Sequence, residues 1–506
     1  MTKLKEKWEF GDFQTPLALA RKCCERVKES GYEPKTVIEP TCGCGNFVIA
    51  ALETFETARA IYAFDVKSQY VDQLRERLPS SEKVRIVPEV ADFFAKEWYE
   101  LLDAVEWTIL ILGNPPWVTS AELAILNSSN SPKKANFRKY TGFDAVTGKS
   151  NFDISEWMLL SHVDWIAERE GTIAMLCKTA VARKILRAKW KKGEALYNAR
   201  MYMIDTLQEF EASVEACLFV CDSAQSDADR DCAVFRSLSA SEPDQAIGYR
   251  RGCLVSDADT FDRREYLFGR DACYRWRSGL KHDCSSVMEL TKTPSGLFNG
   301  RGEYVDIEQE IIYPLLKSSE VASGGKLQKK ERYVIVTQNK IGQKTEMLKY
   351  KTPKAWQYLN ANRKVLDKRA SRIYKTNPSF SIFGVGPYSF EPWKVAISGL
   401  YKQLSFIVIG PRVNKPTMVD DTVYFLACRT EKEASTLARW LNSKVCSKFL
   451  ESMIFWKDKR PIKVDVLKCL NIRELAKEHG EEHLYEEFIG KSEGIDKCDQ
   501  SNNILK

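Results

Sequence analysis

The first 222 residues alternate short apolar runs with longer stretches of helical periodicity, and this pattern restricts the possible folds more than any other feature. The helical stretches lie at about 16–29, 46–57, 67–78 and 93–103. The apolar, β-branched runs lie at 36–40, 60–66, 84–90, 107–113, 171–177, 203–207 and 216–222. Strands that alternate with helices form sheets that helices cover on both faces. We therefore predict an α/β, Rossmann-like domain with a mostly parallel, doubly wound sheet.

The regular alternation ends near residue 222. A polar segment at about 223–232 is typical of a hairpin tip or a domain boundary, and residues 119–150 have the composition of a long loop. Beyond about residue 240, short strands, aromatic residues and basic stretches are mixed without a regular period. The sequence thus predicts two domains, 1–235 and 236–506, the second of them α+β.

The composition limits the compartment. Of the 506 residues, 44% are hydrophobic and 29% are charged, as in globular proteins. The N-terminus lacks the apolar region of a secretory signal, and no apolar run approaches the roughly 18 residues of a membrane span. We expect a cytoplasmic protein of a bacterial or archaeal cell, with no membrane partner and with its 15 cysteines mostly reduced.

The spacing of histidine and cysteine gives little support for a metal site. The sequence contains four histidines and no CxxC pair. His479 and His483 have i, i+4 spacing, but they lie in a polar, charged tail. We predict a solvated helix there and no bound metal.

Residues suited to ligand binding follow the first three apolar runs. A G-x-G turn after the first run, formed by Gly43 and Gly45, lets the backbone approach a ligand closely. Asp65 follows the second run, where an acidic residue suits a pair of ribose hydroxyls. Asp92 follows the third run and can accept from an adenine amino group while Phe93 stacks on the base, although an Asp there is more often a helix N-cap. Because ligands of open α/β sheets bind beyond the carboxyl ends of strands, the joint pattern predicts a nucleotide-like site.

The fourth run ends in ILGNPPWV, residues 111–118. Two consecutive prolines cannot donate backbone hydrogen bonds, so regular structure must stop there. Asn114 precedes a proline and is biased toward an extended conformation. The segment therefore presents an amide, a rigid backbone and the large ring of Trp117 at the end of a buried strand.

In this order, the motifs resemble those of S-adenosylmethionine-dependent DNA adenine-N6 methyltransferases of the γ-type. The FxTP-like segment of that family is matched by Phe13-Gln14-Thr15-Pro16, and its glycine motif is matched by residues 39–47. The family's catalytic N/D-P-P-Y/F/W motif is matched by residues 114–117. The resemblance covers most of the chain and is strongest over 10–220.

Later segments extend the resemblance. Asn151-Phe152-Asp153 corresponds to a further aromatic-containing motif that begins a helix, and Phe210 corresponds to a second base-packing aromatic. Residues 381–402 are similar to a segment of target-recognition regions in restriction–modification methyltransferases. Two positions depart from the common pattern: Trp117 stands where Tyr or Phe is commoner, and Cys44 stands where Ser or Thr is often found.

The resemblance implies a class I methyltransferase domain, S-adenosylmethionine as cofactor and double-stranded DNA as substrate. The residues that it implies for catalysis are Asn114, Pro115, Pro116, Trp117 and Phe210. Those that it implies for cofactor binding are Phe13, Thr15, Pro16, Glu39, Thr41, Gly43, Gly45, Asp65, Asp92, Phe93 and Asn114.

The NPPW segment suits this chemistry. The lone pair of adenine N6 is delocalised into the ring, and acceptors at the Asn114 side chain and the Pro115 carbonyl would favour a pyramidal, nucleophilic nitrogen. Trp117 would stack on a base rotated out of the duplex. The transfer is expected to be a direct in-line displacement, since the Pro-Cys nucleophile of C5-cytosine enzymes is absent from the sequence.

The charge distribution indicates the partner. The net charge is only +7, but residues 344–375 hold ten Lys and Arg against two acidic residues, with Trp356, Tyr358 and Tyr374 between them. Clustered cations with aromatic residues are typical of nucleic-acid contact, although a solvated basic helix is the simpler alternative. The predicted contacts are Lys354, Arg363, Lys364, Lys368, Arg369, Arg372 and Lys375. A second basic candidate is 455–463.

Other functions fit parts of the pattern. An RNA adenine-N6 methyltransferase or a protein-glutamine methyltransferase also uses an NPP-type motif, but a peptide substrate would not require the basic C-terminal half. A fused nuclease lacks a convincing PD…(D/E)xK arrangement, and a non-catalytic binding module would not need the intact motifs. We expect a role in restriction–modification or phage defence, with a cognate restriction endonuclease as a possible partner.

Overall fold

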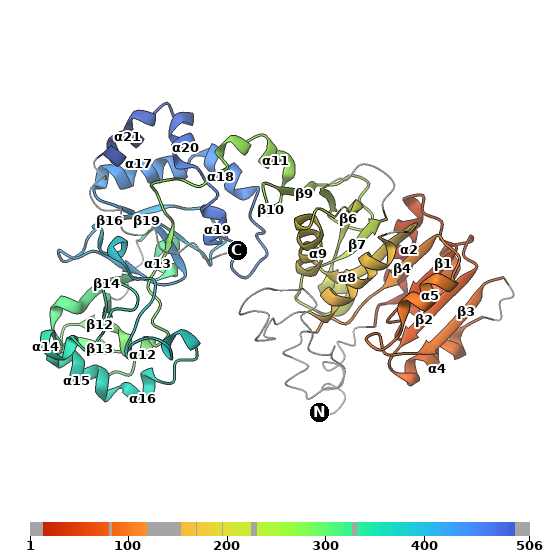
Figure 1. The fold of residues 1–506 in the computed structure, drawn as a ribbon, viewed down its shortest axis with the longest axis horizontal. Coiled ribbons are helices and arrows are strands. Elements are labelled where there is room, and N and C mark those ends of the chain that lie inside the picture. Colours follow the sequence, from red (N-terminus) through yellow and green to blue (C-terminus); the bar gives the residue numbers. More distant parts are fainter. Residues whose placement is uncertain are drawn as a thin grey trace. The chain divides into compact units, whose positions relative to one another are not determined.

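The computed structural model describes residues 14–79, 83–118, 153–167, 169–194, 196–223, 230–325 and 331–490. The chain forms two compact units, Met1–Asp259 and Thr260–Lys506 (Figure 1). The predicted boundary at 235/236 falls inside the sheet of the first unit, between β8 (Asp231–Phe235) and β9 (Gln245–Arg250). The separate roles expected of the two domains stay predictions.

The first unit is built on a ten-stranded mixed sheet with the order β10-β9-β8-β6-β7-β5-β4-β1-β2-β3. Its other strands are β1 (Thr36–Glu39), β2 (Ala60–Asp65), β3 (Arg85–Val90), β4 (Ile109–Gly113), β5 (Gly171–Lys178), β6 (Tyr197–Ile204), β7 (Ala216–Asp222) and β10 (Cys253–Val255). Strands β1 to β5 pair in parallel, whereas β7 is antiparallel to both β5 and β6. The strand order reverses at β1, which lies between β2 and β4, and such a reversal is where open α/β sheets bind ligands.

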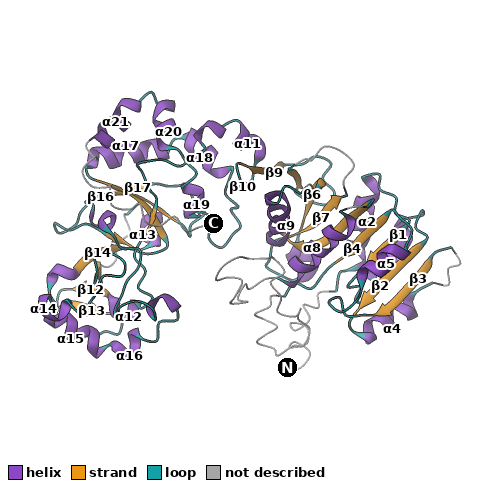
Figure 2. Ribbon diagram, viewed as in Figure 1, coloured by secondary structure: helices purple, strands orange, loops and turns teal. Residues whose placement is uncertain are grey.

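Helices cover this sheet, as Figure 2 shows. They are α2 (Leu17–Glu29), α3 (Asn46–Thr54), α4 (Ser68–Arg77), α5 (Trp98–Ala104), α8 (Ile154–Ile166), α9 (Thr179–Lys191) and the short α10 (Thr206–Phe210). Apolar side chains of α2, α3 and α4 form one core cluster with Leu110 and Leu112 of β4. Helices α8 and α9 pack against β5, and none of their described buried side chains belongs to that cluster. Since strand side chains alternate between faces, Ile109 and Ile111 point away from the cluster, and the predicted doubly wound architecture is confirmed.

The predicted strands agree with β1 to β5 and β7 to within about two residues at each end, which is the usual precision of such boundaries. The strand predicted at 203–207 is wrong in its limits, because β6 ends at Ile204 and α10 begins at Thr206. Asp205 stops the strand: its side chain accepts from the backbone N–H groups of Leu207 and Gln208, both at 3.1 Å. A side chain that caps a helix start in this way favours a turn over continued extension.

The second unit is α+β and contains two smaller sheets. One has the order β11 (Arg277–Ser278), β19 (Val423–Cys428), β16 (Trp393–Ser398) and β17 (Ile407–Ile409). The other has the order β13 (Gly296–Asn299), β12 (Glu289–Thr293), β15 (Arg332–Ile335), β14 (Ile312–Leu316) and β18 (Met418–Val419). The helices are α11 (Ala258–Asp262), which spans the division, α12 (Ser285–Met288), α13 (Ser318–Ala322), α14 (Leu348–Lys351), α15 (Pro353–Ala361), α16 (Arg363–Leu366), α17 (Glu431–Leu441), α18 (Lys444–Glu451), α19 (Val464–Leu467), α20 (Ile472–Glu478) and α21 (Glu482–Gly490).

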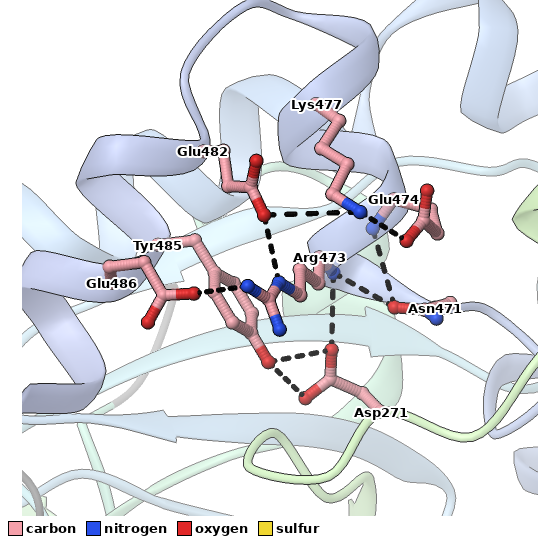
Figure 3. Close-up of polar contacts among 8 residues, drawn as sticks. All are labelled: Asp271, Asn471, Arg473, Glu474, Lys477, Glu482, Tyr485 and Glu486. Atoms are coloured by element: carbon pink, nitrogen blue, oxygen red, sulfur yellow. Dashed lines mark hydrogen bonds and ion pairs between the residues drawn. The ribbon is translucent and has the colours of Figure 1, made fainter.

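A polar network joins α20 and α21 to the chain at Asp271 (Figure 3). The side chain of Arg473 donates to Glu482 at 2.9 Å, and the Lys477 ammonium lies 3.9 Å from the same carboxylate. The Tyr485 hydroxyl donates to the Asp271 carboxylate at 3.0 Å. The cations of these two helices are therefore balanced by neighbouring carboxylates.

Within the described ranges, no helix has both the length and the apolar character needed to cross a membrane. No group of three or more His, Cys, Asp or Glu side chains in that part of the chain is arranged to hold a metal ion. His479 is the C-cap of α20 and His483 lies exposed in α21. The cysteines that the structure describes are free thiols.

Candidate functional site

A cleft lies at the carboxyl edge of the first unit's sheet, where the loops after β1, β2, β3 and β4 meet. The sequence-predicted residues in its lining are Thr15, Glu39, Thr41, Gly43, Asp65, Asp92, Phe93, Asn114 and Pro116. The predicted residues outside that lining are Pro16, Gly45, Pro115, Trp117 and Phe210. Phe13, Asn151 and Phe152 lie outside the described residues. The structure therefore brings the residues that follow four separate strands into one site.

The loop after β1 depends on glycine and on Asp65. Gly43 and Gly45 have φ angles of 50° and 82°, in the left-handed region. A Cβ at Gly45 would lie 2.3 Å from a methyl carbon of Leu74 on α4, so a larger residue there would have to displace this buried side chain as well as adopt a strained φ. The Asp65 carboxylate accepts from the backbone N–H groups of Gly43 and Lys67, both at 2.9 Å. These bonds fix the orientation of the carboxylate at the cleft.

Glu39 is a buried carboxyl group at the end of β1. Its side chain is almost inaccessible, and its Oε2 has no hydrogen-bond partner in the described part of the chain. Burial, and then the negative charge of Asp65, raise the pKa of Glu39 well above its ordinary value. Gly113 leaves little space beside it, because a Cβ there would lie 3.3 Å from the Glu39 Cγ. A buried acceptor of this kind suits a ligand group that is cationic or donates hydrogen bonds.

Asp92 lies in a turn and not at a helix start. Its Oδ1 accepts from the backbone N–H of Phe94 at 2.9 Å, whereas α5 begins only at Trp98. The alternative prediction of a helix N-cap is therefore wrong. The turn presents the Asp92 side chain to the cleft.

Phe93 separates the cleft from a buried aromatic cluster. Its ring centroid lies 5.3 Å from that of Trp98, 5.6 Å from that of His162 and 5.7 Å from that of Trp165. Both ring nitrogens of His162 lack a hydrogen-bond partner among the described residues, and burial lowers the pKa of this histidine to about 3. The cluster fixes the orientation of Phe93, which is what a stacking face requires.

Asn114 is connected to the segment that precedes α2. Its Nδ2 donates to the Thr15 hydroxyl at 3.2 Å, and the Thr15 carbonyl accepts from the Asn46 side chain at 2.7 Å. Thr15 thus links the tetrapeptide after β4 to the start of α3. This contact explains why the FxTP-like segment and the NPPW segment occur in one site.

Trp117 is buried at the end of the tetrapeptide. Its ring meets that of Phe210 edge to face, with centroids 5.3 Å apart and an interplanar angle of 64°. Its backbone carbonyl accepts from the Lys178 ammonium at 2.9 Å. Trp117 and Phe210, the two aromatic residues that the resemblance implies for packing on the substrate base, are therefore in contact.

The lining also includes side chains that the sequence did not single out, among them Lys67, Tyr70 and Met158. The Lys67 ammonium lies 4.9 Å from the centroid of the Tyr70 ring, and both residues follow Asp65 within about one and a half helical turns. Extending the motif after β2 by five residues would have found them. Met158 gives no local signal, since it reaches the cleft from α8 through tertiary packing.

The predicted nucleic-acid contacts in 344–375 fall into different environments. Lys364, Lys368 and Lys375 are exposed and form no ion pair with any residue that the structure describes. Arg372 is also exposed. Lys354 instead pairs with Asp306 at 2.8 Å. The Arg363 guanidinium donates to the side chains of Asn360 and Ser379, at 3.1 Å and 3.3 Å.

Arg369 does not fit its predicted role. It is 7% exposed, and its guanidinium donates to the backbone carbonyls of Leu366, His282 and Ser381 at 2.9, 3.2 and 2.8 Å. The guanidinium also lies 3.7 Å from the centroid of the Tyr374 ring. Carbonyl groups inside the second unit accept the hydrogen bonds of this guanidinium. Arg369 therefore does not belong to the predicted nucleic-acid-binding surface.

The aromatic residues of the same stretch are also part of the interior. Trp356 packs edge to face on Phe380 at 5.5 Å, and the Tyr358 hydroxyl donates to the Val287 carbonyl at 2.9 Å. Both side chains pack against the core cluster of the five-stranded sheet. They stabilise this fold and are not exposed stacking platforms.

The fold and the cleft together define a class I methyltransferase: a doubly wound sheet with an antiparallel β7 between β5 and β6, and a site over the reversal at β1 and β4. The chain is 44% identical over 473 residues to the type II methyltransferase M.NspV of Nostoc sp. strain ATCC 29411 / PCC 7524, and the alignment covers 94% of this chain and 98% of the relative. The chain therefore belongs to the type II methyltransferases. No protein-family model matches it.

Two of the solved structures that align with the chain show the range of the similarity. The type IIL restriction–modification enzyme MmeI, solved in complex with DNA, covers 96% of this chain and 74% of its own, with 11% identity and a TM-score of 0.44. A class I S-adenosylmethionine-dependent methyltransferase of Listeria monocytogenes covers 45% of this chain and 67% of its own, with 13% identity and a TM-score of 0.31. The family assignment rests on the Nostoc relative.

Proposed function

We propose that this methyltransferase transfers the methyl group of S-adenosylmethionine to N6 of adenine in duplex DNA. The observation that carries the proposal is the position of Asn114, which lines the same cleft as the carboxyl groups of Glu39, Asp65 and Asp92. A rigid amide beside three acidic groups combines an acceptor for an amino substrate with a site for a cationic, hydroxyl-bearing cofactor. The type II methyltransferase relative supports the reaction class.

The cleft fits the chemistry of S-adenosylmethionine. The Oε2 of Glu39, buried and without a partner among the described residues, suits the cationic amino group of the methionine part. Asp65 suits the ribose hydroxyls, and Asp92 with Phe93 suits the adenine ring. The tight glycine turn at Gly43 allows a close approach of backbone to ligand.

When bound, the cofactor supplies an electrophilic methyl group, and the chain's own residues prepare the nucleophile. The Asn114 side-chain oxygen and the Pro115 carbonyl would accept hydrogen bonds from the two N–H groups of N6. These bonds strengthen as the nitrogen becomes pyramidal, so they favour the transition state over the ground state. Trp117, with Phe210 against it, would receive the base after its rotation out of the duplex.

Duplex DNA is the proposed substrate because the second unit carries exposed cations that have no acidic partner among the described residues. Lys364, Lys368 and Lys375 meet this condition within 344–375. Cations of this kind bind phosphate without reading sequence. We propose that the biological role is protection of DNA against a cognate restriction endonuclease, or phage defence.

The test compares the wild-type enzyme with Asn114→Ala on duplex DNA and tritium-labelled S-adenosylmethionine. Nucleoside analysis by mass spectrometry identifies the product. We expect N6-methyladenine from the wild type. The variant should lose at least about a hundredfold in kcat, because the missing bond is made mainly in the transition state. Calorimetry should show cofactor binding within about threefold of wild type, since a transition-state interaction adds little to ground-state affinity.

Three results would contradict the proposal. Label in N4-methylcytosine would refute the choice of base. Label in RNA or in a glutamine side chain, with none in DNA, would refute the substrate. Near-normal turnover by Asn114→Ala would remove Asn114 from the catalytic site.

A further inference from the structure

We infer that Lys178 is a positioning residue that holds the NPPW segment in its reactive conformation; this inference rests on the proposed function. Lys178 is the last residue of β5, the strand that pairs with β4. Its ammonium donates to the Trp117 carbonyl at 2.9 Å and to the Asp153 carboxylate at 2.7 Å. One side chain thus connects the catalytic tetrapeptide to a second strand and, through Asp153, to a helix.

The local sequence does not account for a lysine at this position. Lys178 is the N-cap of α9 and makes no capping hydrogen bond with its side chain. N-caps prefer Ser, Thr, Asp or Asn, and a positive charge is unfavourable at the positive end of a helix. A residue that is unfavourable for its local structure is often found where it makes a functional or tertiary interaction. Here the ammonium extends away from the helix start, to Trp117 and Asp153.

Asp153 carries the connection into α8. Its Oδ1 accepts from the backbone N–H of Ser155 at 3.2 Å and from the Ser155 hydroxyl at 2.5 Å, so the carboxylate caps the helix while its other oxygen binds Lys178. The Ile154 N–H donates to the Val118 carbonyl at 2.9 Å, next to the Trp117 bond. Helix α8 is therefore joined to the chain just after the tetrapeptide at the Val118 carbonyl, and through Lys178 to the Trp117 carbonyl.

The Lys178 bond acts on the part of the tetrapeptide that proline does not restrict. Pro115 and Pro116 each have a fixed φ, but the peptide after Trp117 has no such restriction. A bond to the Trp117 carbonyl fixes this peptide, and with it the Trp117 ring against Phe210. The side chains of Lys178 and Asp153 are 23% and 7% exposed, so water competes weakly for the contact. Displacements of about 1 Å in such a site can cost about a hundredfold in rate.

The chain offers a matched control at Lys184. Its ammonium binds Glu156 at 2.9 Å, again between α9 and α8, and the Glu156 side chain is only 3% exposed. The hydrogen bond that the structure gives for Lys184 is to Glu156, whereas the Trp117 carbonyl accepts from Lys178. Lys184→Met therefore removes an ion pair between the same two helices without releasing Trp117.

The experiment measures kcat, KM for DNA and the melting temperature of full-length wild type, Lys178→Met, Lys178→Arg, Asp153→Asn and Lys184→Met. For Lys178→Met we expect kcat to fall by about ten- to a hundredfold, with KM within about threefold, because a misplaced ring and amide affect the transition state more than ground-state binding. Lys178→Arg should recover part of the rate, since a guanidinium can donate to both acceptors. Asp153→Asn should give a smaller loss of kcat in the same direction. Lys184→Met should keep kcat within about twofold, because it leaves the transition-state interactions intact.

The outcomes separate the inference from the proposed function. A kcat of Lys178→Met within twofold of wild type overturns the positioning role. An equal loss in Lys184→Met also overturns it, because the effect would then belong to helix packing in general. A loss confined to KM also overturns the positioning role. So does a loss of kcat that follows a lowered melting temperature in every variant. A wild type that methylates no DNA overturns both proposals.

Discussion

Glu39 is the residue at which the proposed cofactor binding and the stability of the fold make opposite demands. Its pKa is raised by burial and by Asp65, so the folded state holds the proton more tightly than the unfolded state does. The associated stability is present below the ordinary glutamate pKa and is lost as the pH rises toward the folded-state pKa. Glu39→Gln, which is neutral at every pH, should therefore melt higher than wild type at pH 8 and equally at pH 4. The same change should weaken S-adenosylmethionine binding by about tenfold or more, because a charged hydrogen bond is removed.

A surface carboxylate provides the control for Glu39. Glu53 is 46% exposed and pairs with Arg21 at 2.7 Å, and this bond lowers its pKa. Glu53→Gln should not raise the melting temperature at pH 8. Thermal scans from pH 4 to pH 8, with and without cofactor, measure both effects. A Glu39→Gln variant that melts below wild type at pH 8 would contradict the argument.

At the scale of the element, α8 buries a histidine that must stay neutral. The pKa of His162 is lowered to about 3 by burial, whereas an unfolded histidine titrates near 6.5. Stability is therefore complete above pH 6.5 and is lost as the pH falls, by about 1.4 kcal/mol one unit below that value. His162→Leu should remove this loss between pH 6.5 and pH 5, as followed by urea denaturation. His483→Ala, at an exposed site in α21, should keep the wild-type profile; an unchanged profile in His162→Leu would refute the assignment.

The elements of the first unit could be predicted where burial makes them conspicuous. The strands β1, β4 and β7 are buried on both faces or nearly so, and such strands read as continuous apolar runs. Strand β6 was misplaced because Asn198 and Arg200 interrupt its apolar pattern. Strands β8 to β10 follow a polar segment and are too short and mixed to stand out, so the predicted sheet ended too early.

The meeting of the predicted residues in one cleft could also be foreseen from the sequence. Parallel strands bring their carboxyl ends to one edge, so a residue that follows each strand needs no tertiary information to be placed there. Glu39, Asp65, Asp92 and Asn114 were found in this way. Lys178 was not found, because the role inferred for it depends on a bond to a carbonyl 61 residues earlier. Arg369 was misjudged because sequence shows charge and does not show burial.

At the scale of the whole molecule, the proposed function predicts that DNA binds where exposed cations lack acidic partners among the described residues. Lys364→Ala, Lys368→Ala and Lys375→Ala combined should weaken binding to every duplex and leave the methylated sequence unchanged. The slope of log K against log salt should fall by about 0.9 for each phosphate that the variant no longer neutralises. Fluorescence anisotropy at several salt concentrations measures the slope.

A control triple variant removes equal charge from the same unit. Lys432, Arg439 and Lys477 pair with Glu487, Glu481 and Glu474, at 3.0, 2.7 and 2.8 Å. Because these cations are balanced, their replacement by alanine should change the salt slope little. Equal slopes in the two triple variants would show that net charge, and not the 344–375 surface, determines binding. A changed methylated sequence in the first variant would assign these lysines to base recognition.

The return of β9 and β10 onto β8 has a consequence for building chimeric enzymes. Arg250 of β9 binds Asp231 of β8 through two hydrogen bonds, at 2.7 and 2.9 Å, so the sheet is complete only after residue 255. A splice at 235/236 would take β8 and β9 from different parents, and a mismatch between them would leave the β9 side of β8 with unpaired backbone groups, a template for aggregation. A splice at 256/257, after β10 and before α11, keeps every strand of the sheet on one parent and divides no helix. Exchange of the second unit between related enzymes should therefore use the later joint, which replaces one unit while the other keeps all ten strands of its sheet.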